Sequence, residues 1–308
     1  VMALFSWMES FLPWVNSLAA TLSSVFIMLA SGIAIILYKY QNKLLYHPSL
    51  PNMHRDSSRN PPRLRNPAEW GMPYEDIEVV SEDGVRLHCW LIKQAEFSRK
   101  RSTVLFFQEN AGNMGMRLPN MYHLWSQLEV NVFMVSYRGY GKSDGEADEE
   151  GIKKDADAVI LHLSSREDID PKRIIVLGRS LGGAVGVYAA SKHPDRVRGL
   201  ILENTFTSIS DMVDVVLPWV APLKHLVLRI GWRSLEHIPN VTCPILFISG
   251  LQDELVPPSH MERLHQAAVR AKSRRWFTVV DGTHNDTCMR HPGAYCAEIS
   301  AWIKAAGI

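Results

Sequence analysis

The longest hydrophobic stretch lies near the start of the sequence. Between residues 10 and 38 no side chain is charged, and residues 18–37 are all apolar or small. Twenty helical residues span about 30 Å, the thickness of a bilayer core. A buried core helix would show an amphipathic stripe, and a cleaved signal peptide would have a shorter apolar run preceded by a basic residue. Residues 1–38 are therefore predicted to form an N-terminal tail and a transmembrane anchor.

From residue 74 onward, short β-branched segments alternate with helical ones. Residues 77–80 and 85–92 are predicted to form a hairpin around Asp83-Gly84. Further strands are predicted at residues 103–107, 130–136, 174–177, 199–203, 245–249 and 276–280. Helices are predicted at residues 151–163, 181–193, 259–271 and 294–305. This alternation indicates an α/β fold, with a mostly parallel sheet covered by helices on both faces, over residues 74–308.

Residues 206–238 are longer than one crossover helix requires. The segment is rich in valine and leucine, and Pro218 and Pro222 interrupt it. As a small cap it would wall a binding site with apolar surface suited to an acyl chain. The alternative is an ordinary crossover helix packed on the sheet, and the pattern leaves both open.

Charge changes the picture between the anchor and the sheet. Residues 39–65 carry six basic side chains and one acidic one, and five prolines lie between residues 48 and 67. Residues 39–73 are therefore predicted to be a basic juxtamembrane linker that either contacts anionic headgroups or is simply solvated. The positive-inside rule then predicts that the C-terminal domain faces the cytosol. Glycosylation sequons at Asn240 and Asn285 would matter only on the lumenal side.

Overall composition excludes several classes of protein. With 33 Lys and Arg against 32 Asp and Glu, the net charge is +1, so no nucleic-acid partner is expected. The 46% of hydrophobic residues is ample for a folded core. The four cysteines form no CxxC pair, so free thiols are expected, with a Cys288–Cys296 bridge as the alternative. We expect neither a metal nor a cofactor.

The strongest chemical signal is a glycine-rich corner that contains a serine. The predicted strand 174–177 leads into Gly178-Arg179-Ser180-Leu181-Gly182-Gly183, followed by an alanine-rich helix. In this context the G-x-S-x-G pattern predicts a nucleophile on a sharp turn, with glycines where strand and helix cross closely. The alternative is a glycine-lined turn with a capping serine. We expect Ser180 to be the nucleophile.

A serine nucleophile needs a base and an acid that orients the base. Asp253 follows the predicted strand 245–249, and His284 follows the predicted strand 276–280. Since the carboxyl ends of parallel strands share one edge of the sheet, both loops should open beside Ser180. Glu203 is the alternative acid, and His291 is the nearest competing histidine.

The negative charge that develops on an attacked carbonyl needs backbone donors. One is expected from the N–H of Leu181, which directly follows the nucleophile. The other is expected from the N–H of Asn110, in the loop after the predicted strand 103–107.

Several segments together resemble those of one enzyme family. They are Leu44-Leu45-Tyr46-His47-Pro48, Asn110-Ala111-Gly112-Asn113, Tyr137-Arg138-Gly139-Tyr140-Gly141-Lys142-Ser143, the glycine-rich serine corner and Asp281-Gly282-Thr283-His284-Asn285-Asp286. Over residues 74–305 the chain resembles the α/β-hydrolase superfamily. Within it, the chain looks like the membrane-anchored group that includes the plant wavy-growth protein and the yeast bud-emergence suppressor homologues.

This resemblance implies a serine hydrolase that uses Ser180, Asp253 and His284. Wider relatives include protein depalmitoylases, which points to acyl thioester cleavage. One departure is Gln108-Glu109, where many members have His-Gly. A glutamate beside the oxyanion loop would repel developing negative charge unless its side chain points away.

The expected function is a membrane-anchored serine hydrolase that cleaves acyl ester or thioester bonds. The bilayer and an acylated protein or lipid substrate are its expected partners, and a protein depalmitoylase is the narrowest form of this expectation. The alternatives are a lipid or small-ester hydrolase and a weakly active membrane scaffold.

Overall fold

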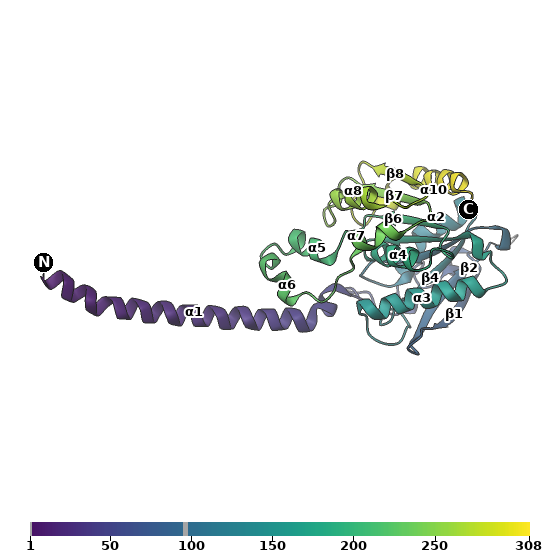
Figure 1. Ribbon diagram of the computed structural model, residues 1–308. Coiled ribbons are helices and arrows are strands. Elements are labelled where there is room, and N and C mark those ends of the chain that lie inside the picture. Colours follow the sequence, from purple (N-terminus) through teal and green to yellow (C-terminus); the bar gives the residue numbers. More distant parts are fainter. Residues whose placement is uncertain (1, 95–97) are drawn as a thin grey trace.

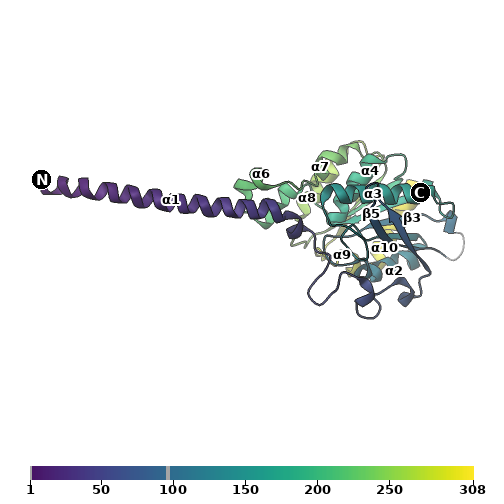
Figure 2. The same ribbon diagram turned by 90° about the horizontal axis from the view of Figure 1, so that it is seen from below.

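The computed structural model describes the backbone of residues 2–94 and 98–308, and the side chains of these residues apart from 2–15, 18 and 19. In this part of the chain, one long helix projects from a domain built around an eight-stranded sheet (Figure 1). The helix lies on the side of the domain that carries α5 and α6 (Figures 1 and 2).

The sheet is parallel except at one edge. Strands β1 and β2 form an antiparallel hairpin, β2 is antiparallel to β4, and the other neighbouring strands are parallel. The strand order is β1-β2-β4-β3-β5-β6-β7-β8. The strands span Tyr74–Val80 (β1), Arg86–Ile92 (β2), Thr103–Phe107 (β3), Asn131–Val135 (β4), Ile174–Arg179 (β5), Gly199–Glu203 (β6), Ile245–Gly250 (β7) and Arg274–Val279 (β8). The expected α/β-hydrolase architecture is confirmed.

Helices cover both faces of the sheet because its central strands bury side chains on each side. In β3, Leu105 and Phe107 pack into one core, whereas Val104 and Phe106 pack into the other. The first face is covered by α3 (Glu149–Ser165), α4 (Leu181–Lys192) and α8 (Pro258–Ala267), and the second by α2 (Leu118–Leu128) and α10 (Pro292–Ala306).

Helix α2 is not among the helices expected from the sequence. Pro119 and Asn120 interrupt its apolar pattern, but Pro119 lies in the first turn, where a helix needs no N–H from it. Proline in the first turn also explains why α10 begins at Pro292 and not at the expected residue 294.

The segment 206–238 is a small cap of short helices. Helix α5 covers Ile209–Val216, α6 covers Lys224–Val227 and α7 covers Ser234–His237. Pro218 and Pro222 fall between α5 and α6, where each prevents a continuous helix. Of the two possibilities that the sequence left open, the structure has the cap.

Helix α1 runs from Met2 to Leu45, beyond the expected end of the anchor at residue 38. Its part Ala20–Leu45 is long and apolar enough to cross a membrane, and the most apolar stretch of that part is not buried in the protein. A core helix would be mostly buried. The N-terminal helix is thus a candidate membrane span.

Residues 46–73 differ from the expected linker because they fold against the domain. Tyr46 and Asn60 are buried, and Asn60 exchanges side-chain hydrogen bonds with Asn113. The guanidinium of Arg55 donates to the carbonyls of Gly141 and Ser143, at 2.9 and 2.7 Å. Polar groups and prolines that suit a solvated spacer here build turns with partners in the domain. The boundary between helix and domain therefore lies at Leu45, and not at residues 38 and 73.

The four cysteines, Cys89, Cys243, Cys288 and Cys296, are free and buried. The alternative of a Cys288–Cys296 bridge is therefore wrong, and the expectation of free thiols holds.

Candidate active site

Ser180 occupies a strained corner between β5 and α4. Its backbone has φ 53° and ψ −120°, a combination that residues other than glycine rarely adopt. The neighbouring glycines permit this turn. A Cβ on Gly178 would lie 2.1 Å from the carbonyl oxygen of Gly182, and one on Gly182 would lie 1.9 Å from that of Phe107. Larger residues would force the strand and the helix apart.

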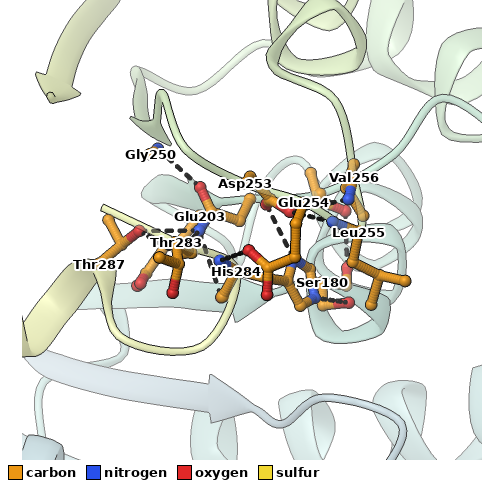
Figure 3. Close-up of polar contacts among 12 residues, drawn as sticks. Ser180, Glu203, Gly250, Asp253, Glu254, Leu255, Val256, Thr283, His284 and Thr287 are labelled. Atoms are coloured by element: carbon orange, nitrogen blue, oxygen red, sulfur yellow. Dashed lines mark hydrogen bonds and ion pairs between the residues drawn. The ribbon is translucent and has the colours of Figure 1, made fainter. Parts of the chain in front are cut away.

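Three side chains that are distant in the sequence meet at this corner (Figure 3). The Nε2 of His284 lies 3.0 Å from the Oγ of Ser180, and its Nδ1 lies 2.8 Å from the Oδ2 of Asp253. All three residues are buried. The other carboxylate oxygen of Asp253 accepts the N–H groups of Leu255 and Val256, at 2.9 and 2.8 Å, so the carboxylate cannot turn away from the ring.

Asn204 ties together the loops that carry the acid and the histidine. Its side-chain nitrogen donates to the carbonyl of Thr283 at 3.1 Å, and its side-chain oxygen accepts the N–H of Gly250 at 2.9 Å. Its φ of 46° belongs to the left-handed region, which asparagine tolerates. Sequence reasoning missed Asn204, although its position directly after β6, at the same edge of the sheet, was a usable signal.

The two competing residues do not reach Ser180. The carboxylate of Glu203 is fully buried, pairs with Arg179 at 3.0 Å and accepts the hydroxyl of Tyr295 at 2.7 Å. The ring of His291 is exposed and contacts Asp281 at 3.0 Å. Among the described residues, the chain of hydrogen bonds from Ser180 therefore runs through His284 to Asp253.

The two expected oxyanion donors lie beside the serine. Leu181 and Asn110 line the same cavity as Ser180, and Leu181 is the first residue of α4, where N–H groups have no partner within the helix. The carbonyl of Asn110 accepts the hydroxyl of Tyr140 at 2.6 Å and the N–H of His47 at 2.9 Å. These bonds fix the Asn110 peptide from two sides.

The tyrosines of the Tyr137–Ser143 segment therefore support the loop that carries Asn110. The hydroxyl of Tyr137 donates to the carbonyl of Gln108 at 3.0 Å, next to the contact that Tyr140 makes with Asn110. The sequence singled out this segment only by resemblance. The contacts supply its physical role.

Glu109 does not carry an unbalanced charge into the site. Its buried carboxylate pairs with Arg117 at 2.9 Å and with Arg179 at 3.1 Å. Burial acts to raise the pKa of Glu109, but the two arginines outweigh it and hold the pKa below its ordinary value. The negative charge is therefore compensated beneath the oxyanion loop.

An apolar cavity of about 260 Å³ opens over Ser180. Its walls come from the end of α1, from the cap and from the loop after Asp253. The residues that line it are Leu37, Gln41, Leu44, Leu45, Asn110, Ser180, Leu181, Phe206, Ile209, Met212, Val213, Val216, Leu217, Val220, Val227, Leu228, Ile230, Leu255 and Val256. Sequence reasoning expected the cap here but not α1.

Comparison with known proteins agrees with this architecture. Residues 104–226 match the model of the alpha/beta hydrolase fold. The chain is similar to the alpha/beta hydrolase domain-containing protein WAV2 of Arabidopsis thaliana, with 45% identity over 84% of this chain and 86% of that protein. It is 40% identical to the protein bem46 of Schizosaccharomyces pombe, over 82% of this chain and 83% of that protein.

Solved structures share the fold at low sequence identity. The esterase Pf2001 of Pyrococcus furiosus superposes with a TM-score of 0.69, covering 86% of this chain and 98% of the esterase, at 17% identity. The group resemblance expected from the sequence is confirmed by the curated relatives. The chain belongs to the alpha/beta hydrolase family.

Proposed function

We propose that this protein is a membrane-anchored serine hydrolase that cleaves acyl esters or thioesters through an acyl-enzyme. One observation carries the proposal: Ser180, which is hydrogen-bonded through His284 to Asp253, lines an apolar cavity. The chain belongs to the alpha/beta hydrolase family, and an esterase shares its fold. Both findings support hydrolysis as the reaction class.

In this mechanism the Oγ of Ser180 attacks the acyl carbonyl while the Nε2 of His284 takes the hydroxyl proton. Asp253 holds the Nδ1–H and stabilises the imidazolium. The N–H groups of Leu181 and Asn110 bind the oxyanion. Collapse breaks the bond to the alcohol or thiol, which leaves with the proton from His284. Water, deprotonated by His284, then attacks the carbonyl of the acyl-enzyme. The bond from the acyl carbon to the Oγ of Ser180 breaks, His284 returns the proton to the Oγ, and the carboxylic acid leaves.

The apolar cavity supports a medium or long acyl chain as the preferred acyl group. Each methylene removed from water contributes about 0.8 kcal/mol, so four extra carbons stabilise the transition state by up to about 3 kcal/mol. Thioesters are expected to react at least as well as oxygen esters, and protein depalmitoylation is the narrowest form of the proposal. Hydrolysis of a lipid or small ester is the second candidate, since the same cavity accepts any acyl chain.

The proposal includes a single-pass anchor with the hydrolase domain in the cytosol. The basic residues Lys39 and Lys43 near the end of α1 support this orientation. Protease added to sealed microsomes should digest the domain. Protection from protease, or glycans on the exposed Asn240 or Asn285, would contradict it.

Labelling with a fluorophosphonate probe tests the nucleophile. Ser180→Ala should abolish labelling and lower turnover by about 10³-fold or more. Ser191→Ala on α4 is the matched control, because the hydroxyl of Ser191 makes a local hydrogen bond to the carbonyl of Tyr188. His284→Ala should cost a similar factor, and the two losses should not add because the residues act as a unit. Persistent labelling of Ser180→Ala would contradict the assignment.

Activity separates an enzyme from a scaffold. Purified full-length protein in vesicles should hydrolyse a graded panel of acyl esters and thioesters. A folded wild type that neither labels nor turns over any of them would favour the scaffold.

A further inference from the structure

The end of α1 is a wall of the cavity and not only an anchor. Leu37, Gln41 and Leu44 line the cavity together with cap residues and Ser180. Since Leu37 precedes Leu44 by seven positions, the two lie on one face of the helix, about two turns apart. An acyl chain bound above Ser180 would therefore contact the same face of the helix that enters the membrane.

Gln41 holds this wall against the cap. Its side chain is only 7% exposed, although its neighbours Tyr40 and Lys39 on the same helix are exposed. The Oε1 accepts the N–H groups of Arg229 and Ile230, at 2.7 and 2.9 Å, and the Nε2 donates to the carbonyl of Val227 at 3.2 Å. Because one side chain satisfies three backbone groups, helix and cap keep a defined register.

Aromatic and basic side chains mark the level of the bilayer surface. Tyr38 lies beneath the guanidinium of Arg229, 4.6 Å from its ring centre, and Tyr40 lies near the ammonium groups of Lys39 and Lys43. Tyrosine and basic residues gather at membrane interfaces, where the ring is apolar and the charge is solvated. With the proposed anchor in a bilayer, the cavity wall at Leu37 is next to this level, and the cavity lies at the membrane surface.

The cap presents apolar side chains beside this opening. Val216 is 49% exposed, Trp219 65% and Leu226 78%. Helix α6 contacts α1, and both α5 and α6 lie toward the projecting helix (Figures 1 and 2). Large apolar side chains exposed on one short segment are unfavourable in water but suit the boundary of a bilayer.

We propose that an acyl chain enters the cavity sideways from the bilayer, along α1, with Leu37 and Leu44 as determinants of chain length. The occupant is the acyl chain of a bilayer-resident ester or thioester, whether its leaving group is a lipid or a protein. The inference rests on the proposed hydrolase function. Its additional content is that the membrane helix forms part of the substrate site and that the cap edge of Val216, Trp219 and Leu226 contacts the bilayer.

The first test fills the cavity from the side of α1. Full-length wild type, Leu37→Trp and Ile36→Trp are compared in phosphatidylcholine vesicles with acetyl and octanoyl thioesters. The neighbouring Ile36 is 57% exposed and does not line the cavity, so it is the matched control. Leu37→Trp should lower the ratio of octanoyl to acetyl kcat/KM about tenfold, the effect of losing contact with about two methylenes. Ile36→Trp should keep the wild-type ratio.

The second test concerns entry from the bilayer. Leu226→Asp is compared with Val269→Asp, since Val269 is 70% exposed but lies beyond α8, away from the cap. The substrates are a vesicle-embedded palmitoyl thioester and a soluble acetyl thioester. Leu226→Asp should lower the ratio of palmitoyl to acetyl turnover several-fold, and Val269→Asp should leave that ratio at the wild-type value.

The outcomes distinguish failure of this inference from failure of the proposed hydrolase function. A wild type that hydrolyses none of the thioesters contradicts the proposed function. A wild type that is active, with equal chain-length ratios in Leu37→Trp and Ile36→Trp, overturns the role of α1. Equal ratios in Leu226→Asp and Val269→Asp overturn entry from the bilayer. A palmitoyl lipid ester and a palmitoylated peptide, assayed side by side, identify the leaving group.

Discussion

The indole Nε1 of Trp232 donates a hydrogen bond to the hydroxyl of Tyr46 at 2.9 Å, across 186 positions of sequence. Both residues are buried, and Tyr46 directly follows the last residue of α1. The exit of the helix is thereby fixed in the core next to the cap. The direction of α1 relative to the site is set by packing, and not by a free linker.

Removal of the Tyr46 hydroxyl should destabilise this junction. Tyr46→Phe leaves the buried indole N–H of Trp232 without an acceptor, which costs about 1–3 kcal/mol. Chemical denaturation of the full-length protein in detergent micelles measures the free energy of unfolding. Tyr122→Phe on α2, far from this contact, is the control. Equal stability of wild type and Tyr46→Phe would show that the bond contributes nothing.

The two candidate acids should respond differently to neutralisation. Asp253→Asn should lower kcat by about 10⁴-fold while the fold persists, because the amide favours the wrong imidazole tautomer. Glu203→Gln should instead lower the free energy of unfolding, because it leaves the buried guanidinium of Arg179 with one charged partner fewer. Turnover and denaturation are measured for both. A larger loss of turnover in a folded Glu203→Gln would reverse the assignment.

The hydroxyl of Tyr140 should affect catalysis through Asn110. Tyr140→Phe removes a hydrogen bond to the carbonyl of Asn110, so the neighbouring peptide is less well oriented toward the oxyanion. We expect kcat to fall by up to about tenfold, with KM nearly unchanged. Tyr137→Phe is the comparison, since its partner is the carbonyl of Gln108. A change confined to KM would assign Tyr140 to substrate binding instead.

Stability should depend on pH through Asp83. The hydrogen bond from Arg138 is the main cause that lowers the pKa of Asp83 from 3.8 to about 2. A depressed folded-state pKa stabilises the protein above the ordinary pKa, and this stabilisation is lost as the pH falls through the folded-state value. Asp83→Asn should therefore be less stable than wild type at pH 5, and the difference should vanish near pH 2.

Thermal unfolding between pH 5 and pH 2 measures this effect. Glu82→Gln is the matched control, because Glu82 is exposed and, among the described residues, pairs only with Lys154, at 3.2 Å. Its effect should stay at about 0.5 kcal/mol or less. A difference between wild type and Asp83→Asn that is the same at every pH would contradict the role of the Asp83 charge.

Truncation should distinguish the anchor from the cavity wall. Deletion of residues 1–38 keeps Gln41 and Tyr46, so the domain should remain soluble and reactive toward the fluorophosphonate probe. Deletion of residues 1–45 removes the bonds of Gln41 to the backbone near Arg229, and the cap should become sensitive to limited proteolysis. Equal resistance of the two truncated proteins would show that the Gln41 contacts do not hold the cap.

The sequence determined the positions of Ser180, Asp253 and His284 because all three depend on strand order and not on packing detail. A run of buried parallel strands brings the loops at their carboxyl ends to one edge. Any polar residue just after such a strand is therefore near its counterparts. The same logic applies to Asn204, which directly follows β6 at this edge.

Only the tertiary structure decided the roles of Gln41, Tyr46 and Glu109. No sequence pattern identifies the partners of a glutamine near the end of a helix, and those partners lie about 190 residues away, within the cap. The negative charge of Glu109, next to Asn110, is compensated because Arg117 and Arg179 form ion pairs with its carboxylate from other elements. The periodicity of apolar residues predicts which face of a helix or strand is buried. It does not predict which other element packs against that face. The fold and the meeting of Ser180, Asp253 and His284 follow from the first kind of information. The contact between α1 and the apolar cavity follows from the second.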